Sequence, residues 1–120
     1  MSVNKRTVGS KEEDEAARFL TQCGLKIVEL NFRSRVGEID IVARDGDILV
    51  FAEVKYRKTA SNGHPEEAVD YKKSRTICKV SDYYRYLHNI PSDVQIRFDV
   101  IAIENTQFHW YKNAFPYMGM

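Results

Sequence analysis

The sequence comprises 120 residues, of which 43% are hydrophobic and 29% are charged. This composition excludes a wholly disordered chain, and we expect a single domain over residues 1–120, with a frayed segment at about residues 1–9. The formal net charge of +1 excludes a protein that attracts nucleic acid by a positive charge over its whole surface, so any such contact needs a local basic patch.

The first predicted helix begins at Ser10 and ends at Gly24. Ser10 is followed three positions later by Glu13, which is the spacing of a capping box. Apolar residues then recur at helical intervals from Ala16 onward, and glycine is typical of the position just past a helix C-terminus. Residues 25–32 are predicted to form the first strand.

Two β-rich runs, residues 38–43 and 48–55, flank the dipeptide Asp45-Gly46. Asp-Gly between two such runs is a strong signal for a hairpin with a two-residue turn. Alternate residues from Ile39 to Ala43 and from Ile48 to Val54 are all apolar, so we expect them to face the core together.

A polar loop is predicted over residues 56–64, followed by a second helix from Pro65 to about His88, with a break near Asp70 left open. The expected apolar stripe of this helix comprises Ile77, Val80, Tyr84 and Leu87. The last predicted strands cover residues 96–103 and 108–111. The order α-β-β-β-α-β(-β) predicts an α/β fold in which a mixed sheet has helices on both faces.

The hairpin brings acidic side chains together. A turn at Asp45-Gly46 places Glu38 opposite Glu53 and Asp40 diagonal to Glu53, with Cα atoms roughly 7–8 Å apart. Because side chains alternate along a strand, Asp40, Glu53 and Lys55 are expected on one side. Two alternatives stay open: a three-residue turn would send Glu53 to the opposite face, and charged residues near strand ends are solvated in most proteins.

Strands that are apolar on both faces are typical of a covered position, where unpaired carboxylates cost several kcal/mol. We therefore predict a divalent cation, Mg²⁺ or Mn²⁺, held by Asp40, Glu53 and the main-chain carbonyl of Val54. Such an ion supports phosphodiester hydrolysis, because it neutralises charge and lowers the pKa of a bound water. Lys55 would orient or deprotonate that water, or stabilise the developing charge. Glu13 is a further candidate ligand, although a capping-box role competes with it.

Asp40 followed by Glu53-Val54-Lys55 resembles the Asp…Glu-x-Lys signature of the PD-(D/E)xK nuclease superfamily, and the order of elements is similar to that of its restriction-endonuclease-like core. A longer resemblance covers nearly the whole chain and is to the YraN-like family of small uncharacterised bacterial proteins. The segments that carry it are residues 13–20, 31–33, 37–43, 50–57, 63–69 and 97–101, together with Lys73.

These resemblances imply an endonuclease-like fold in which Asp40, Glu53 and Lys55 fall on the superfamily's catalytic site and Glu13 on its first-helix glutamate. Two positions depart from the YraN-like pattern. Glu12 stands where glycine is usual before the helix glutamate, and Ser74 stands where glutamine is frequent.

Basic residues from three segments flank the predicted acids and are candidates for phosphate contacts. They are Arg33 and Arg35 before the hairpin, Arg57 and Lys58 after it, and Lys72, Lys73, Arg75 and Lys79 in the second helix, of which Arg33, Arg35, Arg57 and Lys73 are the leading candidates. An ordinary solvated surface explains each group equally well. The aromatic residues Tyr83, Tyr84, Tyr86 and Trp110 are interpreted mostly as packing residues rather than as platforms for bases.

The leading hypothesis is a divalent-metal-dependent nuclease, or nuclease-like protein, that acts on DNA in preference to RNA, with branched, single-stranded or structured substrates all open. The alternatives are a module of the same fold that binds nucleic acid without cleaving it, and a homodimeric interaction protein.

The two cysteines, Cys23 and Cys78, have no CxxC partner, which excludes a zinc ribbon and favours a reducing compartment. Neither a signal peptide nor a membrane span is predicted, so the expected location is the cytoplasm and no membrane partner is expected.

Overall fold

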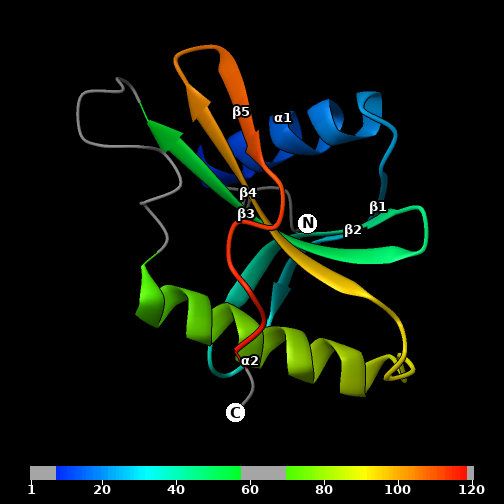
Figure 1. Ribbon diagram of the computed structural model, residues 1–120. Coiled ribbons are helices and arrows are strands. Elements are labelled where there is room, and N and C mark those ends of the chain that lie inside the picture. Colours follow the sequence, from blue (N-terminus) through cyan, green and yellow to red (C-terminus); the bar gives the residue numbers. More distant parts are fainter. Residues whose placement is uncertain (1–7, 58–69, 119–120) are drawn as a thin grey trace, which may run out of the picture.

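The computed structural model describes residues 8–57 and 70–118, with the backbone alone described at residues 8–10 and 57. Its elements, shown in Figure 1, are α1 (Val8–Gln22), β1 (Lys26–Arg33), β2 (Glu38–Asp45), β3 (Ile48–Arg57), α2 (Tyr71–Leu87), β4 (Ile96–Glu104) and β5 (Gln107–Tyr111). The strands form one sheet in the order β1-β2-β3-β4-β5, in which β3 and β4 are parallel and the other neighbours are antiparallel. The predicted order of elements and the mixed α/β sheet are confirmed.

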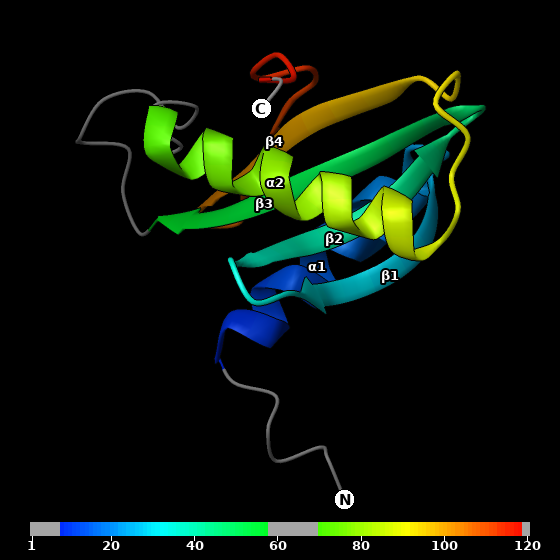
Figure 2. The same cartoon turned by 90° about the horizontal axis from the view of Figure 1, so that it is seen from below.

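The sheet has an apolar core on each face, and each core is covered by one helix (Figure 2). On the α1 side, Ala16 and Leu20 pack against alternate residues of β2, β3 and β4. The core on the α2 side is aromatic: the ring of Tyr84 lies 5.0 Å from that of Phe32 and 5.6 Å from that of Phe51. Helices on both faces therefore follow from strands that are apolar on both sides.

The start of α1 differs from the prediction, whereas its end agrees. α1 begins at Val8, so Ser10 lies inside the helix and the predicted capping box is wrong. Residues 8 and 9 are helical rather than frayed, and residues 1–7 lie outside the described part of the chain. At the other end Gly24 has a φ of +102°, and the Leu25 N–H donates to the Leu20 carbonyl at 3.0 Å. This is a Schellman C-cap, which requires the left-handed conformation that glycine adopts readily.

The second helix begins after Asp70, whose side chain accepts a hydrogen bond from the Lys73 N–H at 2.8 Å. α2 therefore begins where the prediction left a break open, while the predicted helix over residues 65–69 lies outside the described residues. Leu87 is exposed, which contradicts its place in the predicted stripe. His88, four residues after Tyr84, is also exposed, although its ring lies 4.3 Å from the Tyr84 ring. Among the described residues, no helix is long and apolar enough to cross a membrane.

The turn between β2 and β3 lies one residue later than predicted. Asp45 pairs with Ile48, so the two loop residues are Gly46 and Asp47. Gly46 has a φ of +63°, which suits the first central position of a type II′ turn, where glycine is preferred. The loop still has two residues, so the alternation of faces along the paired part of the hairpin is as predicted.

β1 and β2 exchange faces halfway along their length. Leu30 pairs with Ile41, and both pack on the α1 side. Phe32 pairs with Ile39 two residues further along, and both pack on the α2 side. Regular strands would keep all four on one face, so the prediction that Ile39 and Ile41 face the core together is wrong. Asn31 lies between the two pairs with a φ of +56°, and this left-handed residue interrupts the alternation in β1.

Candidate functional site

β2 and β3 separate at the end of the hairpin that lies away from the turn. Their last paired residues are Ile41 and Ala52, although β3 remains paired with β4 as far as Arg57. Beyond the last pair, the Val54 N–H donates to Oδ2 of Asp40 at 2.9 Å rather than to a main-chain carbonyl of β2. The Asp40 carboxylate therefore lies in the opening between two strands.

Two further carboxylates approach Asp40. One oxygen each from Glu13, Glu38 and Asp40 can be chosen so that all three lie within 4.8 Å of one another. Glu13, from α1, is only 8% exposed and Asp40 is 7% exposed, while Glu38 is half-buried. Oε1 of Glu13 is buried without a hydrogen-bond partner. A buried oxygen of this kind costs about 1–3 kcal/mol or more, so the arrangement is costly unless a proton or a cation joins it.

Glu53 approaches from the α2 side of the sheet. Its side chain is only 6% exposed, and its Oε2 lies 3.1 Å from Nζ of Lys73, in the first turn of α2. Burial and, next, the charge of Asp40 raise the pKa of Glu53 from 4.5 to about 7, against the opposing charges of Lys73 and Lys55. Burial alone would lower the pKa of Lys73, but the charge of Glu53 raises it overall. The ion pair thus offsets part of the cost of burying Glu53.

Glu13 has the same electrostatic problem, and in the described part of the chain no lysine is among the main groups that shift its pKa. Burial, then the charge of Asp40 and a hydrogen bond to Asp40, raise the pKa of Glu13 from 4.5 to about 7, and a hydrogen bond with Asn31 opposes the rise. A raised carboxyl pKa means that the protonated form is favoured in the folded protein. Glu13, Glu38, Asp40 and Glu53, here called the acid cluster, therefore hold more negative charge than their surroundings neutralise.

The structure brings the predicted residues together in a different way from the one expected. Asp40 and Glu53 are electrostatically coupled, but they approach from the strand opening and from the α2 side rather than from one common face. Glu13 reaches these carboxylates from α1. Because α1 begins at Val8, Glu13 is not the capping-box partner of Ser10. Lys55, half-buried and two residues beyond Glu53, lies near enough for its charge to lower the pKa of Glu53. The Val54 carbonyl as a metal ligand stays a prediction.

Sequence reasoning did not single out Glu38 as a site residue. The available signal was its position two residues before Asp40 on the same strand, which gives both side chains one direction. Among the residues predicted to contact phosphate, Arg33 pairs with Glu38 at 3.1 Å and Lys73 pairs with Glu53, whereas Arg35 is exposed. The side chain of Arg57 lies outside the described part of the structure.

Another buried carboxylate, Asp99 in β4, has hydrogen-bond donors for both of its oxygens. Arg97 donates from Nε at 2.9 Å and from Nη2 at 3.0 Å, Trp110 donates from Nε1 at 2.9 Å, and the Asn113 N–H donates at 2.9 Å. Arg97 also pairs with Asp45 at 3.0 Å. This network joins β4, β5 and the segment after β5, so its role is structural.

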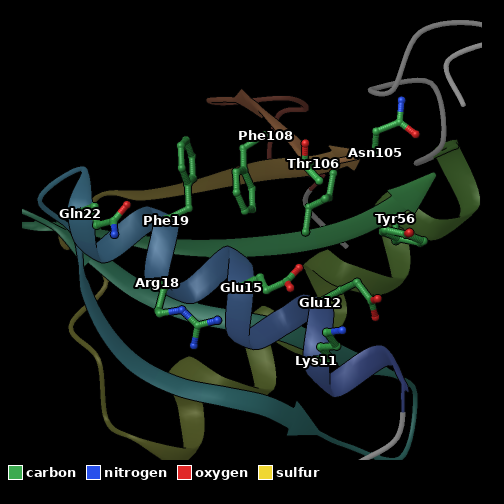
Figure 3. Close-up of a pocket in the computed structure, with 11 residues that line it drawn as sticks. Lys11, Glu12, Glu15, Arg18, Phe19, Gln22, Tyr56, Asn105, Thr106 and Phe108 are labelled. Carbon is green, nitrogen blue, oxygen red and sulfur yellow. The ribbon is translucent and has the colours of Figure 1, made fainter. Parts of the chain in front are cut away.

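A hollow of about 470 Å³ lies along α1 beside the ends of β3, β4 and β5 (Figure 3). Phe19 and Phe108 form part of its wall, and their rings stack with centroids 4.7 Å apart. Its charged residues are Lys11, Glu12, Glu15 and Arg18. None of the residues that line it belongs to the acid cluster, so this hollow is separate from the candidate site.

The molecule is thus a small α/β domain, with a five-stranded mixed sheet between two helices and a buried acid cluster where two strands separate. Residues 12–103 match the family described as "Uncharacterised protein family UPF0102", and the chain belongs to this family. A UPF0102 protein of Lachnoclostridium phytofermentans is 42% identical over 117 residues, which cover 98% of this chain and 99% of that protein. Similar proteins occur in Persephonella marina (43% identical; 89% of this chain and 91% of that protein) and Shewanella loihica (40% identical; 95% and 98%).

Proposed function

We propose that this protein is a divalent-metal-dependent nuclease of the PD-(D/E)xK kind, which hydrolyses phosphodiester bonds in DNA. One observation carries the proposal: buried carboxylates from α1, β2 and β3 converge where β2 and β3 separate, with one oxygen of Glu13 lacking a hydrogen-bond partner. Buried acids in such excess are typical of sites that bind a cation.

The residues of the acid cluster fit Mg²⁺ or Mn²⁺. Both ions prefer oxygen ligands, and carboxylates are the side chains that supply them. Asp40 and Glu13 would hold the ion, with Glu38 or Glu53 able to complete the protein ligands. When bound, a divalent cation would neutralise the phosphate and lower the pKa of a water molecule, which are the two requirements of phosphodiester hydrolysis.

The chain's own residues have distinct tasks in this proposal. The Val54 N–H fixes the orientation of the Asp40 carboxylate. Lys73 holds Glu53 through the 3.1 Å ion pair and reduces its repulsion from Asp40. Lys55, on the same side of β3 as Glu53, would orient the attacking water or stabilise the negative charge that develops on the phosphate.

The order of elements and the parallel pairing of β3 with β4 support the assignment to a restriction-endonuclease-like core. The sequence pattern Asp40…Glu53-Val54-Lys55 and the resemblance to the YraN-like family point the same way. Both are likenesses of fold and motif, so the activity itself is argued from the chemistry of the acid cluster.

A cleavage assay tests the proposal. End-labelled single-stranded, duplex and four-way-junction DNA, and single-stranded RNA, are incubated with the protein and Mg²⁺ or Mn²⁺. We expect cleavage of at least one DNA substrate, no cleavage in EDTA, and a loss of roughly 10²–10³-fold or more in Asp40→Asn and in Glu53→Gln. Asp47→Asn, an exposed acid in the hairpin turn, is the matched control and should retain activity. Equal cleavage by wild type and both site variants, after contaminants are removed, would overturn the proposal.

The ion pair between Glu53 and Lys73 favours a second candidate, a module that binds nucleic acid without cleaving it. A lysine can neutralise an acid in place of a metal, and a site of that kind has no need of a cation. This candidate predicts binding of oligonucleotides that is the same in EDTA and in Mn²⁺, with no cleavage under either condition. A homodimeric interaction protein, the remaining alternative, would be detected by sedimentation.

A further inference from the structure

The outward face of α2 carries a stripe of basic and aromatic side chains. The stripe comprises Tyr71, Arg75, Lys79, Tyr83 and Tyr86, each three or four residues after the one before. This spacing places side chains on one face of a helix. Tyr86 is 79% exposed, so the interpretation of these aromatic residues as mostly packing residues fails for it, whereas Tyr83 is 44% exposed and its ring lies 6.0 Å from that of Phe32. Only Tyr84, between them, is buried.

The loop between β1 and β2 lies against α2 and forms a groove of about 590 Å³ with it. The groove is lined by Arg33, Ser34, Arg35, Val36, Lys79 and Tyr83. Gly37 permits the close approach, because a Cβ at this position would come within 2.7 Å of the Thr76 side chain. Within the loop, the Ser34 N–H and hydroxyl both donate to the Gly37 carbonyl, at 2.8 and 3.2 Å. The groove is therefore preformed, which reduces the entropic cost of binding a ligand.

The groove is lined by basic residues, and two further hollows adjoin it. Among the described residues, Arg35 and Lys79 have no carboxylate partner, while Arg33 pairs with Glu38. One adjoining hollow is also lined by Lys79 and extends along α2 to Tyr71. Another is also lined by the residues of the β1–β2 loop and extends to Glu38. Since Glu38 belongs to the acid cluster, these adjoining hollows, which carry Lys79, Arg35 and Arg33, lead from α2 to that cluster.

We infer that this groove binds an unpaired nucleic-acid strand and directs it to the acid cluster. The inference rests on the proposed nuclease function and deepens it by naming the substrate class. Lys79 and Arg35 contact phosphates, and Tyr83, beside the apolar Val36, provides a surface on which a base stacks.

The combination of charges and exposed aromatic rings decides between an unpaired strand and a duplex. A duplex presents phosphates to a groove of this size and keeps its bases stacked inside, so it would use the cations but not Tyr83. An unpaired strand offers a base to every exposed ring, and stacking of that kind strengthens binding without sequence preference. The groove volume lies within the range of about 300–1,000 Å³ that small ligands occupy, which is room for a nucleotide.

Fluorescence anisotropy in EDTA tests the inference without cleavage, with a labelled 20-mer of mixed sequence as a single strand and as a duplex. We expect tighter binding of the single strand, a roughly tenfold loss for that strand in Tyr83→Ala, and near wild-type binding in Tyr83→Phe. In a plot of the logarithm of the binding constant against the logarithm of the salt concentration, the slope for the single strand is negative. Lys79→Ala should reduce the magnitude of this slope by about 0.7. Arg18→Ala is the matched control, since this exposed cation lies on α1 at the separate hollow.

Three results would overturn the inference. They are wild-type single-strand affinity in Tyr83→Ala, an equal loss in Tyr83→Phe, and self-association through this face without any binding of nucleic acid. Asp40→Asn separates the inference from the proposed function. It should retain single-strand binding in EDTA while losing cleavage. If Asp40→Asn still cleaves, the nuclease proposal is wrong, but the inference that the groove binds an unpaired strand stands. If Tyr83→Ala leaves both binding and cleavage unchanged, only the inference about the groove is wrong.

Discussion

Asp99 and three members of the acid cluster, Glu13, Asp40 and Glu53, are buried, but their surroundings differ. Asp99 is 1% exposed and accepts four hydrogen bonds, two of them from the guanidinium of Arg97. In the acid cluster, burial and, next, the charge of Asp40 raise the pKa of both Glu13 and Glu53, and one oxygen of Glu13 has no hydrogen-bond partner among the described residues.

The comparison shows that the hydrogen-bond donors around a buried carboxylate can distinguish a structural role from a functional one. Donors around Asp99 are matched to its oxygens, so its removal should harm the fold. In the acid cluster one buried oxygen of Glu13 has no hydrogen-bond partner among the described residues, and the carboxylates repel one another, so neutralising one of them should help the fold in the absence of metal. Four expected outcomes test this contrast.

The largest effect is expected for Asp99→Ala. It leaves Arg97 buried with Asp45 as its remaining ion-pair partner among the described residues, and it removes the acceptor of the Trp110 ring N–H. The free energy of unfolding should fall by about 3–5 kcal/mol in urea titrations. Asp47→Ala, in the exposed hairpin turn, should change it by no more than about 0.5 kcal/mol. A loss below about 1 kcal/mol for Asp99→Ala would mean that the network is not structural.

The second outcome concerns pH in the absence of divalent cations. The pKa values of Glu13 and Glu53 are raised from 4.5 to about 7, so between these values the folded chain binds more protons than the unfolded chain. The free energy of unfolding should therefore fall as pH rises from about 5 to 8, by on the order of 3 kcal/mol. Urea titrations across this range measure it, and the double variant Glu13→Gln, Glu53→Gln should flatten the curve. A rise in stability with pH would contradict the electrostatic account.

A smaller effect is expected for Glu13→Gln. The amide cannot ionise, and it can donate to Asp40 at every pH, as only the protonated carboxyl can in the wild type. At pH 8 without metal, the variant should be more stable than the wild type by about 2 kcal/mol, and the gain should disappear near pH 5. Thermal unfolding at the two pH values measures both differences. Destabilisation at pH 8 would place Glu13 with Asp99 among the structural carboxylates.

The smallest effect is expected for Trp110→Phe, which removes one of the four donors to Asp99 while keeping an aromatic ring beside Phe19. The loss should be about 1 kcal/mol in urea titrations. In the Asp99→Ala background the same substitution should cost less, because the hydrogen bond is already absent. Additive losses would show that the two side chains do not act together.

The sequence predicted the elements well because the local signals are strong. The period-two alternation identified the hairpin strands, and the glycine after α1 ended that helix as expected. The hairpin turn was shifted by one residue, because the Asp-Gly cue fits the loop at either of two positions, and the structure uses Gly46 as the first loop residue.

The site was predicted less completely because it depends on contacts between distant segments. Asp40 and Glu53 were found from their spacing, but their approach from two sides depends on where β2 and β3 separate. Asparagine adopts a positive φ more readily than most residues, but the strand pattern around Asn31 does not indicate that it does so there. The contact between Lys73 and Glu53 likewise depends on how α2 packs on the sheet.

Isothermal titration calorimetry with Mn²⁺ at pH 7 tests the central claim most directly, because it measures cation binding by the acid cluster without requiring a substrate. The wild type should bind Mn²⁺ and release protons, since Glu13 and Glu53 have pKa values of about 7 and a cation favours their ionised forms. Asp40→Asn should lose most of the binding, while Asp99→Asn, if folded, should retain it. An absence of Mn²⁺ binding in the folded wild type, or equal binding in Asp40→Asn, would contradict the assignment of the acid cluster as a metal site.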